Sequence, residues 1–220
     1  KNNNVTLVLN LKAQGGNVVI RSQILDKDDN NKVIFDRSFI DTPAKDVMAD
    51  GEDDPSAPFI TTGNFVLYLY ENNGTDQDHY QVIYDNAEVY VMDDALLDDF
   101  NDNTKTGWAD SDPAHLPAAV VPPRSETNQR FEFLLPPLGQ SYFVNSTKTT
   151  KAFELKEGER HQFRVDLVSG YGNDSFAVLA WIPTATGANS LAGYGIAKSE
   201  SDILITKGIG KYFYAENPAT

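Results

Sequence analysis

The sequence predicts an all-β protein, an antiparallel β-sandwich of the jelly-roll type. Apolar and polar residues alternate in most segments, which is the pattern of half-buried strands. These segments recur at regular spacing, separated by Asn, Asp, Gly and Pro, the residues that favour turns. Only residues 95–100 offer as much as one helical turn. A chain of 220 residues, 40% of them hydrophobic, is long enough to bury a core of this kind.

The first three strands form a regular set. In residues 5–11 (VTLVLNL) the apolar side chains at odd positions share one face. Residues 17–26 (NVVIRSQILD) and 32–41 (KVIFDRSFID) flank the cluster DKDDNN, which spans residues 26–31. Asp and Asn side chains bond their own backbone in turns, so the cluster predicts a hairpin loop.

Two later segments are apolar on both faces and therefore predict central strands of the sandwich: residues 63–70 (GNFVLYLY) and 175–183 (SFAVLAWIP). Residues 80–91, 129–135, 161–168 and 202–214 complete the set. Long polar insertions, rich in Asp and Pro, occupy residues 42–62 and 109–128. Proline removes a donor from the strand ladder, so we expect surface loops there.

Composition excludes several classes of partner. The net charge of -14 disfavours nucleic acid and anionic membranes, which bind Lys- and Arg-rich surfaces. No apolar run reaches the roughly 18 residues of a membrane span, so membrane insertion is not expected. The absence of cysteine excludes disulfides and zinc thiolates. An acidic, Asn-rich and Tyr-rich chain of this kind fits an extracellular or cell-surface protein, and its start at Lys1 indicates processing or excision from a longer chain.

Several segments together resemble a known family. The stretches LLDDFNDNTKTGW (residues 96–108), RFEFLLPP, KAFELKEGERHQFRVDLVSG and DSFAVLAWIP resemble the opening half of a laminin-G-like, concanavalin-type jelly roll of bacterial surface proteins. GNFVLYLY and YQVIYDNAEVYV resemble its closing strands. Residues 1–92 thus resemble the second half of the fold and residues 93–220 the first, which is the reverse of the family's order.

The reversed order has three explanations. The chain is a circular permutant closed on itself, one period of a tandem array, or a subunit whose halves pair with neighbouring copies. In the last two cases, unpaired strands invite strand donation between copies. We therefore expect a head-to-tail junction in the region of Asp85, Asn86, Phe100 and Trp108.

Two acidic regions are candidate calcium sites. By the resemblance, a structural calcium ion near the first and last strands would use Asp85, Asp98 and Asp99. An alternative loop places Asp26, Asp28 and Asn30 at alternate positions, as in the first half of a calcium loop. Asn31 and Arg37 replace the Gly and Glu of an EF-hand, which excludes that motif. The competing interpretation is that these side chains cap turns and keep the surface soluble.

The sequence contains no catalytic signature. The alternating carboxylates of sugar-cleaving jelly rolls, the nucleophile elbow and the phosphate loop are all missing. Sugar binding would use exposed aromatic rings, for which Tyr142, Tyr171 and Tyr194 are candidates beside Gly or polar residues. The tryptophans, Trp108 and Trp181, are expected in the core or an interface.

These observations predict a non-catalytic, extracellular structural or adhesive unit. Its partners would be copies of itself, assembled head to tail into a fibre, filament or tandem array. The alternative is a carbohydrate-binding module of a secreted protein, with glycans as partners. A polysaccharide-degrading enzyme ranks third.

Overall fold

The computed structural model describes residues 4–42, 61–71, 82–91, 94–98, 100–102, 104–111, 124–127, 130–133, 143–169, 175–183, 193–199, 202–208 and 211–216. Their regular structure is entirely β-strand: β1 (Val5–Gln14), β2 (Asn17–Asp26), β3 (Lys32–Asp41), β4 (Thr62–Glu71), β5 (Val82–Val91), β6 (Asp94–Asp98), β7 (Trp108–Ser111), β8 (Arg124–Thr127), β9 (Arg130–Phe133), β10 (Phe143–Thr149), β11 (Phe153–Glu154), β12 (Arg160–Ser169), β13 (Ser175–Pro183), β14 (Tyr194–Lys198), β15 (Ile203–Gly208) and β16 (Lys211–Glu216). Within these residues, no helix is long and apolar enough to span a membrane.

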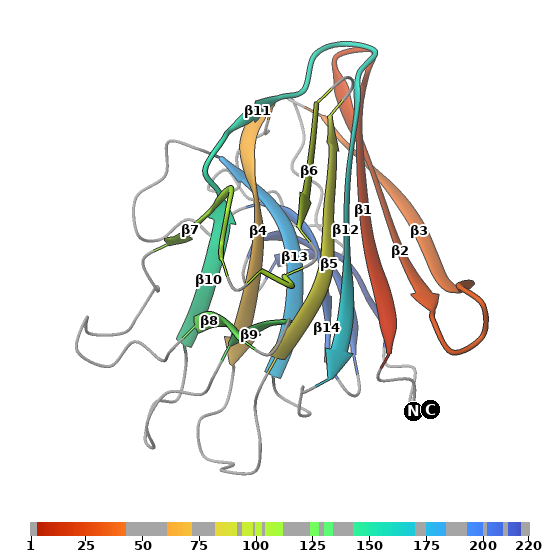
Figure 1. Cartoon of the computed structure of the whole chain (residues 1–220). Helices are drawn as coiled ribbons and strands as arrows, with labels where there is room; N and C mark the ends of the chain where they lie inside the picture. Colours follow the sequence, from red (N-terminus) through yellow and green to blue (C-terminus); the bar gives the residue numbers. More distant parts are fainter. Residues whose placement is uncertain are drawn as a thin grey trace.

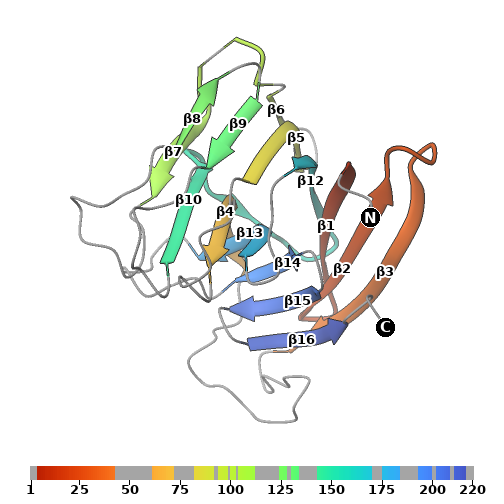
Figure 2. The same ribbon diagram turned by 90° about the horizontal axis from the view of Figure 1, so that it is seen from below.

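Two antiparallel sheets pack together as a β-sandwich (Figures 1 and 2). The front sheet has the strand order β3-β2-β1-β12-β5-β9-β8, and β6 pairs with β5 beside β9. The back sheet has the order β16-β15-β14-β13-β4-β10-β7, and β11 pairs with β4 beside β10. The predicted all-β sandwich is confirmed.

The core lies between the inner faces of the two sheets. Leu7 and Leu9 of β1 are fully buried, as the alternation in residues 5–11 predicts. Aromatic rings join the two layers, since Phe163 of β12 lies 5.0 Å from Phe65 of β4, edge to face. Trp181 of β13 is fully buried beside them. Burying a large apolar side chain stabilises a fold by about 1.5–3 kcal/mol, so these residues dominate the stability.

The two strands predicted to be apolar on both faces lie at the centre of the back sheet. β4 and β13 pair over nine residues, from Ser175↔Glu71 to Pro183↔Gly63. Their outward side chains include Val66, Val178 and Ala180, which form a second buried cluster with Ala197. The prediction of central strands is therefore confirmed.

The DKDDNN cluster forms the predicted hairpin between β2 and β3. The Asp26 carboxylate accepts hydrogen bonds from the backbone N–H groups of Asp28 (2.9 Å) and Asp29 (3.3 Å). Asn30 and Asn31 adopt left-handed backbone conformations, with φ of 53° and 58°. Asn tolerates this region better than most residues, which explains its place in the turn.

The helical turn predicted at residues 95–100 is wrong, because β6 is a strand. It forms a tight hairpin with β5, with Val91 opposite Asp94 and Ala87 opposite Asp98. Pairing with the open edge of β5 outweighs the weak local preference for a turn of helix. β8 and all but the first residue of β7 likewise fall within the predicted loop at residues 109–128. The other residues of that loop, and most of residues 42–62, lie outside the described residues.

Strands from the two halves of the chain are interleaved. β1, from the first half, lies between β2 and β12, and β5 lies between β12 and β9. In the back sheet, β4 lies between β13 and β10. Each sheet therefore contains strands from both halves of the chain.

Candidate functional site

The outer face of the front sheet presents an ordered array of polar side chains. Even-numbered residues of β1 and β12 point outward because their odd-numbered neighbours fill the core. Strand register brings these side chains into rows that cross the strands. The central row, which we call the amide row, consists of Ser38, Arg21, Asn10, Gln162 and Tyr90.

The amide row ends in an exposed aromatic ring. Gln162 Nε2 donates a hydrogen bond of 2.7 Å to Asn10 Oδ1, across the pair of β12 and β1. Tyr90 is 41% exposed and stands directly opposite Gln162. Its hydroxyl donates to the Glu88 carboxylate over 3.3 Å. An accessible ring beside amide groups can stack on an apolar face while the amides bond hydroxyls.

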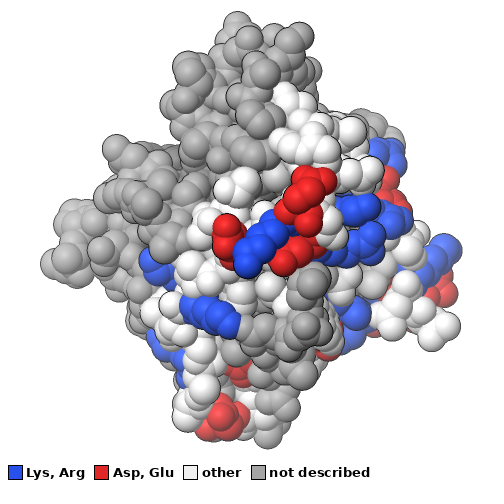
Figure 3. Space-filling model, turned by 90° about the horizontal axis from the view of Figure 1, so that it is seen from above, with Lys and Arg blue, Asp and Glu red and all other residues white. Residues whose placement is uncertain are grey.

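A hollow of about 200 Å³ adjoins the amide row. Basic and amide side chains dominate its wall, and we call it the basic hollow: Asn10, Lys12, Val19, Arg21, Gln23, Ser38, Arg160 and Gln162. Figure 3 looks down on the sandwich and shows basic side chains gathered in a band, with acidic side chains beside them.

One wall of the basic hollow is fixed by an ion pair. Arg21 donates to both carboxylate oxygens of Asp36, from Nε over 2.8 Å and from Nη2 over 2.5 Å. Gln23 donates to the same carboxylate over 3.2 Å. Hydrogen bonding to Arg21 holds the pKa of Asp36 below its ordinary value. The bidentate geometry fixes the Arg21 side chain against β3.

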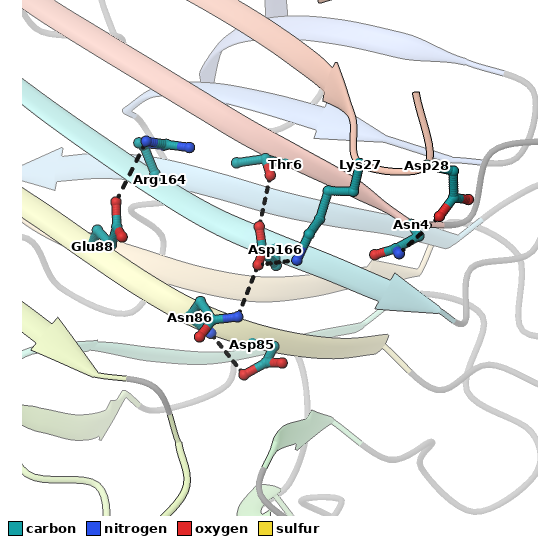
Figure 4. A network of polar contacts seen from close by, with 9 residues as sticks. All are labelled: Asn4, Thr6, Lys27, Asp28, Asp85, Asn86, Glu88, Arg164 and Asp166. Atoms are coloured by element: carbon teal, nitrogen blue, oxygen red, sulfur yellow. Dashed lines mark hydrogen bonds and ion pairs between the residues drawn. The ribbon is translucent and has the colours of Figure 1, made fainter. Parts of the chain in front are cut away.

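A second hollow of about 220 Å³ lies on the same face. Asp166 lies in its wall, and Figure 4 shows the polar contacts of this buried carboxylate. Thr6 Oγ1 donates to Asp166 Oδ1 over 2.7 Å. Lys27 Nζ and Asn86 Nδ2 donate to Oδ2 over 2.5 Å and 2.9 Å. Three donors from three strands or turns thus converge on one carboxylate, which ties β1, β5 and the β2–β3 turn to β12.

Asp85 stands at the edge of this cluster, where β5 carries a bulge. Its carboxylate accepts a hydrogen bond from the backbone N–H of Asn86 over 2.9 Å. Burial raises the pKa of Asp85, and the neighbouring Asp166 charge adds to the effect. The Lys27 ammonium pairs with Asp166, so that carboxylate already has a cationic partner.

Two of the remaining calcium candidates, Asp98 and Asp26, accept hydrogen bonds from backbone N–H groups. Asp98 accepts a hydrogen bond from the backbone N–H of Phe100 over 2.9 Å. Asp26 caps its own turn, and Asp28 accepts from the Asn4 amide over 3.1 Å. Asp99 lies outside the described residues. Among the residues that are described, no group of three or more His, Asp or Glu side chains is placed to hold a metal. Calcium binding stays a prediction.

Of the three tyrosines predicted to stack on sugar rings, the structure describes only Tyr194. Tyr142 and Tyr171 lie outside the described residues. The prediction of an exposed Tyr194 is wrong, because its ring is fully buried between the sheets and its hydroxyl donates to the buried Asp41 carboxylate. The glycines around Tyr194 permit close packing: a Cβ on Gly193 would come within 2.6 Å of the Trp181 carbonyl oxygen.

The aromatic residues of the predicted junction belong to the core of this chain. Phe100 is fully buried, with its ring 5.4 Å from Phe131 and 6.3 Å from Trp108. Trp108 is 5% exposed and packs 5.9 Å from Phe163 of the front sheet. Their packing therefore joins the segment after β6 to the core of the same chain, whereas the Asn86 side chain bonds Asp166 on the outer face of the front sheet.

The sequence interpretation missed Tyr90, Asn10 and Gln162. Alternation along β1 and β12 is a signal that orients Asn10 and Gln162 outward. Tyr84 and Tyr90 have the same parity, so strict alternation would place both rings on one face. The bulge at Asn86, with φ of 48°, reverses the parity, and Tyr84 is buried while Tyr90 is exposed.

Comparison of the sequence with known proteins identifies no relative. No family model matches the chain, and no curated protein is significantly similar to it.

Proposed function

We propose that the chain is a non-catalytic extracellular binding module whose front sheet binds a glycan. The amide row, with exposed Tyr90 at its end, is the observation that carries this proposal. Sugar rings present hydroxyl groups at their edges and an apolar face, which match amide side chains and a tyrosine ring.

The amide row keeps hydrogen-bonding capacity for a ligand. The bond between Gln162 and Asn10 uses one N–H and one carbonyl oxygen. Within the described part of the chain, the Gln162 carbonyl and the Asn10 NH₂ group form no further side-chain bond. Adjacent strands lie about 4.8 Å apart, so the row from β5 to β1 spans about 10 Å of open surface. An extended polymer fits such a surface better than a small enclosed ligand.

The carboxylates of this face support binding over catalysis. Asp36 pairs with Arg21, Asp166 with Lys27, and Glu88 lies 3.6 Å from Arg164. Cations engage these three carboxylates, while Asp85, whose pKa is raised by burial, accepts the backbone N–H of Asn86. The paired carboxylates fix the positions of the basic side chains.

A glycan array followed by calorimetry tests the proposal. Tyr90→Ala and Gln162→Ala should each weaken binding to the selected glycan about threefold to tenfold, the value of one stacking or hydrogen-bonding contact. Ile40→Ala is the control, since Ile40 is 63% exposed on the same sheet but outside the amide row. Failure to bind any polysaccharide, or equal affinity in all three variants, would contradict the proposal.

Self-assembly is the second candidate function. Three aliphatic side chains are exposed on β3, the last strand of the front sheet: Val33 is 48%, Ile34 46% and Ile40 63% exposed. Exposed apolar side chains on a terminal strand favour association with another chain. We expect Ile40→Lys to lower the association constant in analytical ultracentrifugation. A wild-type protein that remains a monodisperse monomer at high concentration would count against assembly.

The laminin-G-like resemblance remains part of the proposal. Its support is the interleaving of β1 and β5 with β12, since a permuted chain places its first and second halves side by side in each sheet. The acidic, Asn-rich and Tyr-rich composition is the support for an extracellular location.

A further inference from the structure

Two basic side chains face each other directly on the front sheet. Lys12 of β1 and Arg160 of β12 are register partners. Like charges opposite each other in an antiparallel pair are destabilising. Such a pair is therefore a local cost to the fold, and it lies at the rim of the basic hollow beside the amide row.

Neither member of this pair forms an ion pair with another side chain in the described part of the chain. Lys12 Nζ donates to the neutral Gln14 Oε1 over 2.8 Å, and Arg160 is exposed and forms no ion pair there. The nearby Glu157 carboxylate accepts hydrogen bonds from the backbone N–H groups of Gly15 and Gly16 over 2.7 Å and 3.2 Å. These bonds lower the pKa of Glu157, and the Lys12 charge makes a smaller contribution in the same direction. Glu157 therefore serves the turn that it bonds.

The pair is unusual for this protein as a whole. The chain has 18 basic and 32 acidic residues. A chain of net charge -14 repels an anion at long range. The Lys12–Arg160 pair can therefore attract an anion only at contact distance. Arg21, in the same wall, is already neutralised by Asp36 and adds donors whose geometry is fixed.

We propose that the basic hollow binds an anionic group, a carboxylate or sulfate, carried on the rings of an acidic polysaccharide. The guanidinium of Arg160 would take two oxygens of that group, and the Lys12 ammonium would act as a point charge beside it. Asn10 and Gln162 are shared by the amide row and the basic hollow, so the same ligand reaches both. This inference rests on the proposed glycan-binding function and adds the class of glycan.

The experiment compares three polymers by calorimetry: polygalacturonate for carboxylates, dextran sulfate for sulfates, and neutral dextran. Wild type should bind at least one acidic polymer more tightly than dextran, with affinity falling as salt rises. Lys12→Gln with Arg160→Gln should weaken that binding about tenfold to a hundredfold and leave dextran binding unchanged. The control, Lys32→Gln with Lys156→Gln, removes the same charge from exposed side chains outside the hollow and should bind as wild type.

The outcomes separate this inference from the proposed function. Equal affinity for neutral and acidic polymers, reduced by Tyr90→Ala, would overturn the anionic preference and leave glycan binding in place. An equal loss in both double variants would reduce the effect to net charge and also overturn the inference. If the protein bound none of the three polymers and no glycan on an array, both proposals would be overturned.

Discussion

Replacing His161 with Phe should make the stability of the protein less sensitive to acid. His161 lies on the inner side of β12 and is fully buried. The rings of Phe65, Phe153 and Trp181 surround it at centroid distances of 6.2, 6.3 and 5.7 Å. Burial among these rings lowers the pKa of His161 below its ordinary value of 6.5, and the opposing effects of the Glu159 charge and the Glu154 backbone are smaller.

The sign of the effect follows from the two states. As the pH falls below about 6.5, the unfolded chain takes up a proton at His161 while the folded protein stays neutral. The contribution of His161 to the free energy of unfolding therefore decreases as the pH is lowered, until the pH reaches the folded-state pKa of His161. Below that pH this contribution is constant. The largest slope that one proton can give is about 1.4 kcal/mol per pH unit. His161→Phe removes this contribution and should stay within about 1.5 kcal/mol of wild type at pH 8.

Urea unfolding of wild type and His161→Phe at half-unit steps from pH 8 to pH 5 measures the difference directly. Other carboxylates titrate equally in both proteins, so the difference between the two free energies isolates His161. Wild type should lose stability relative to the variant as the pH falls. Glu159→Gln removes the charge 3.9 Å from Nε2 and should deepen the loss. A pH-independent difference, or a relative gain in acid, would refute the reasoning.

Three further substitutions test the packing and the surface. Asp166→Ala removes the acceptor of three hydrogen bonds and should cost about 2–4 kcal/mol in chemical denaturation; a loss below 1 kcal/mol would contradict the convergence seen in the structure. Tyr194→Phe removes the donor to buried Asp41 and should cost about 1–3 kcal/mol by the same assay, whereas an exposed Tyr194 would give no change. Lys12→Gln relieves the repulsion with Arg160 and should raise stability by about 0.2–1 kcal/mol at low salt; a lower melting temperature would disprove that repulsion.

The fold was predictable from the sequence because alternation reports burial directly. The odd-numbered apolar residues of β1 fill the core, and β4 and β13, apolar on both faces, are central strands. Pairing was not predictable in the same way. β1 lies beside β12, about 150 residues later, and such contacts depend on the register of the complete sandwich.

The candidate site depends on those long-range pairings, and local signals were misleading there. Tyr194 lies between two glycines, which suggested a loop. A Cβ on Gly195 would come within 3.0 Å of the Leu179 carbonyl oxygen, so the glycine serves close strand packing. The exposure of Tyr90 was not predictable, because strict alternation along the strand would place it on the same face as the buried Tyr84. The bulge at Asn86 instead turns the Tyr90 ring outward. Acidic clusters such as Asp26 and its neighbours are explained as turn caps.

The amide row also offers a test of how the two halves of the chain meet. Asn10 comes from the first half and Gln162 from the second, and they bond each other across β1 and β12. If the sandwich closes within one chain, a mixture of Asn10→Ala and Gln162→Ala proteins, unfolded and refolded together, contains no intact row. If the halves pair between copies, random pairing regenerates about a quarter of the sites from the unsubstituted strands.

Calorimetry on the co-refolded mixture distinguishes the two arrangements. Closure within one chain predicts the weak glycan binding of the single variants and no high-affinity sites. Co-refolded wild type is the positive control, and the two variants refolded separately and then mixed control for exchange after folding. Recovery of wild-type affinity in a fraction of sites only after co-refolding would show exchange between copies, and would favour the fibre or array over a self-contained permutant. Because the site exists only where the halves meet, ligand binding reports their connection as well as the function.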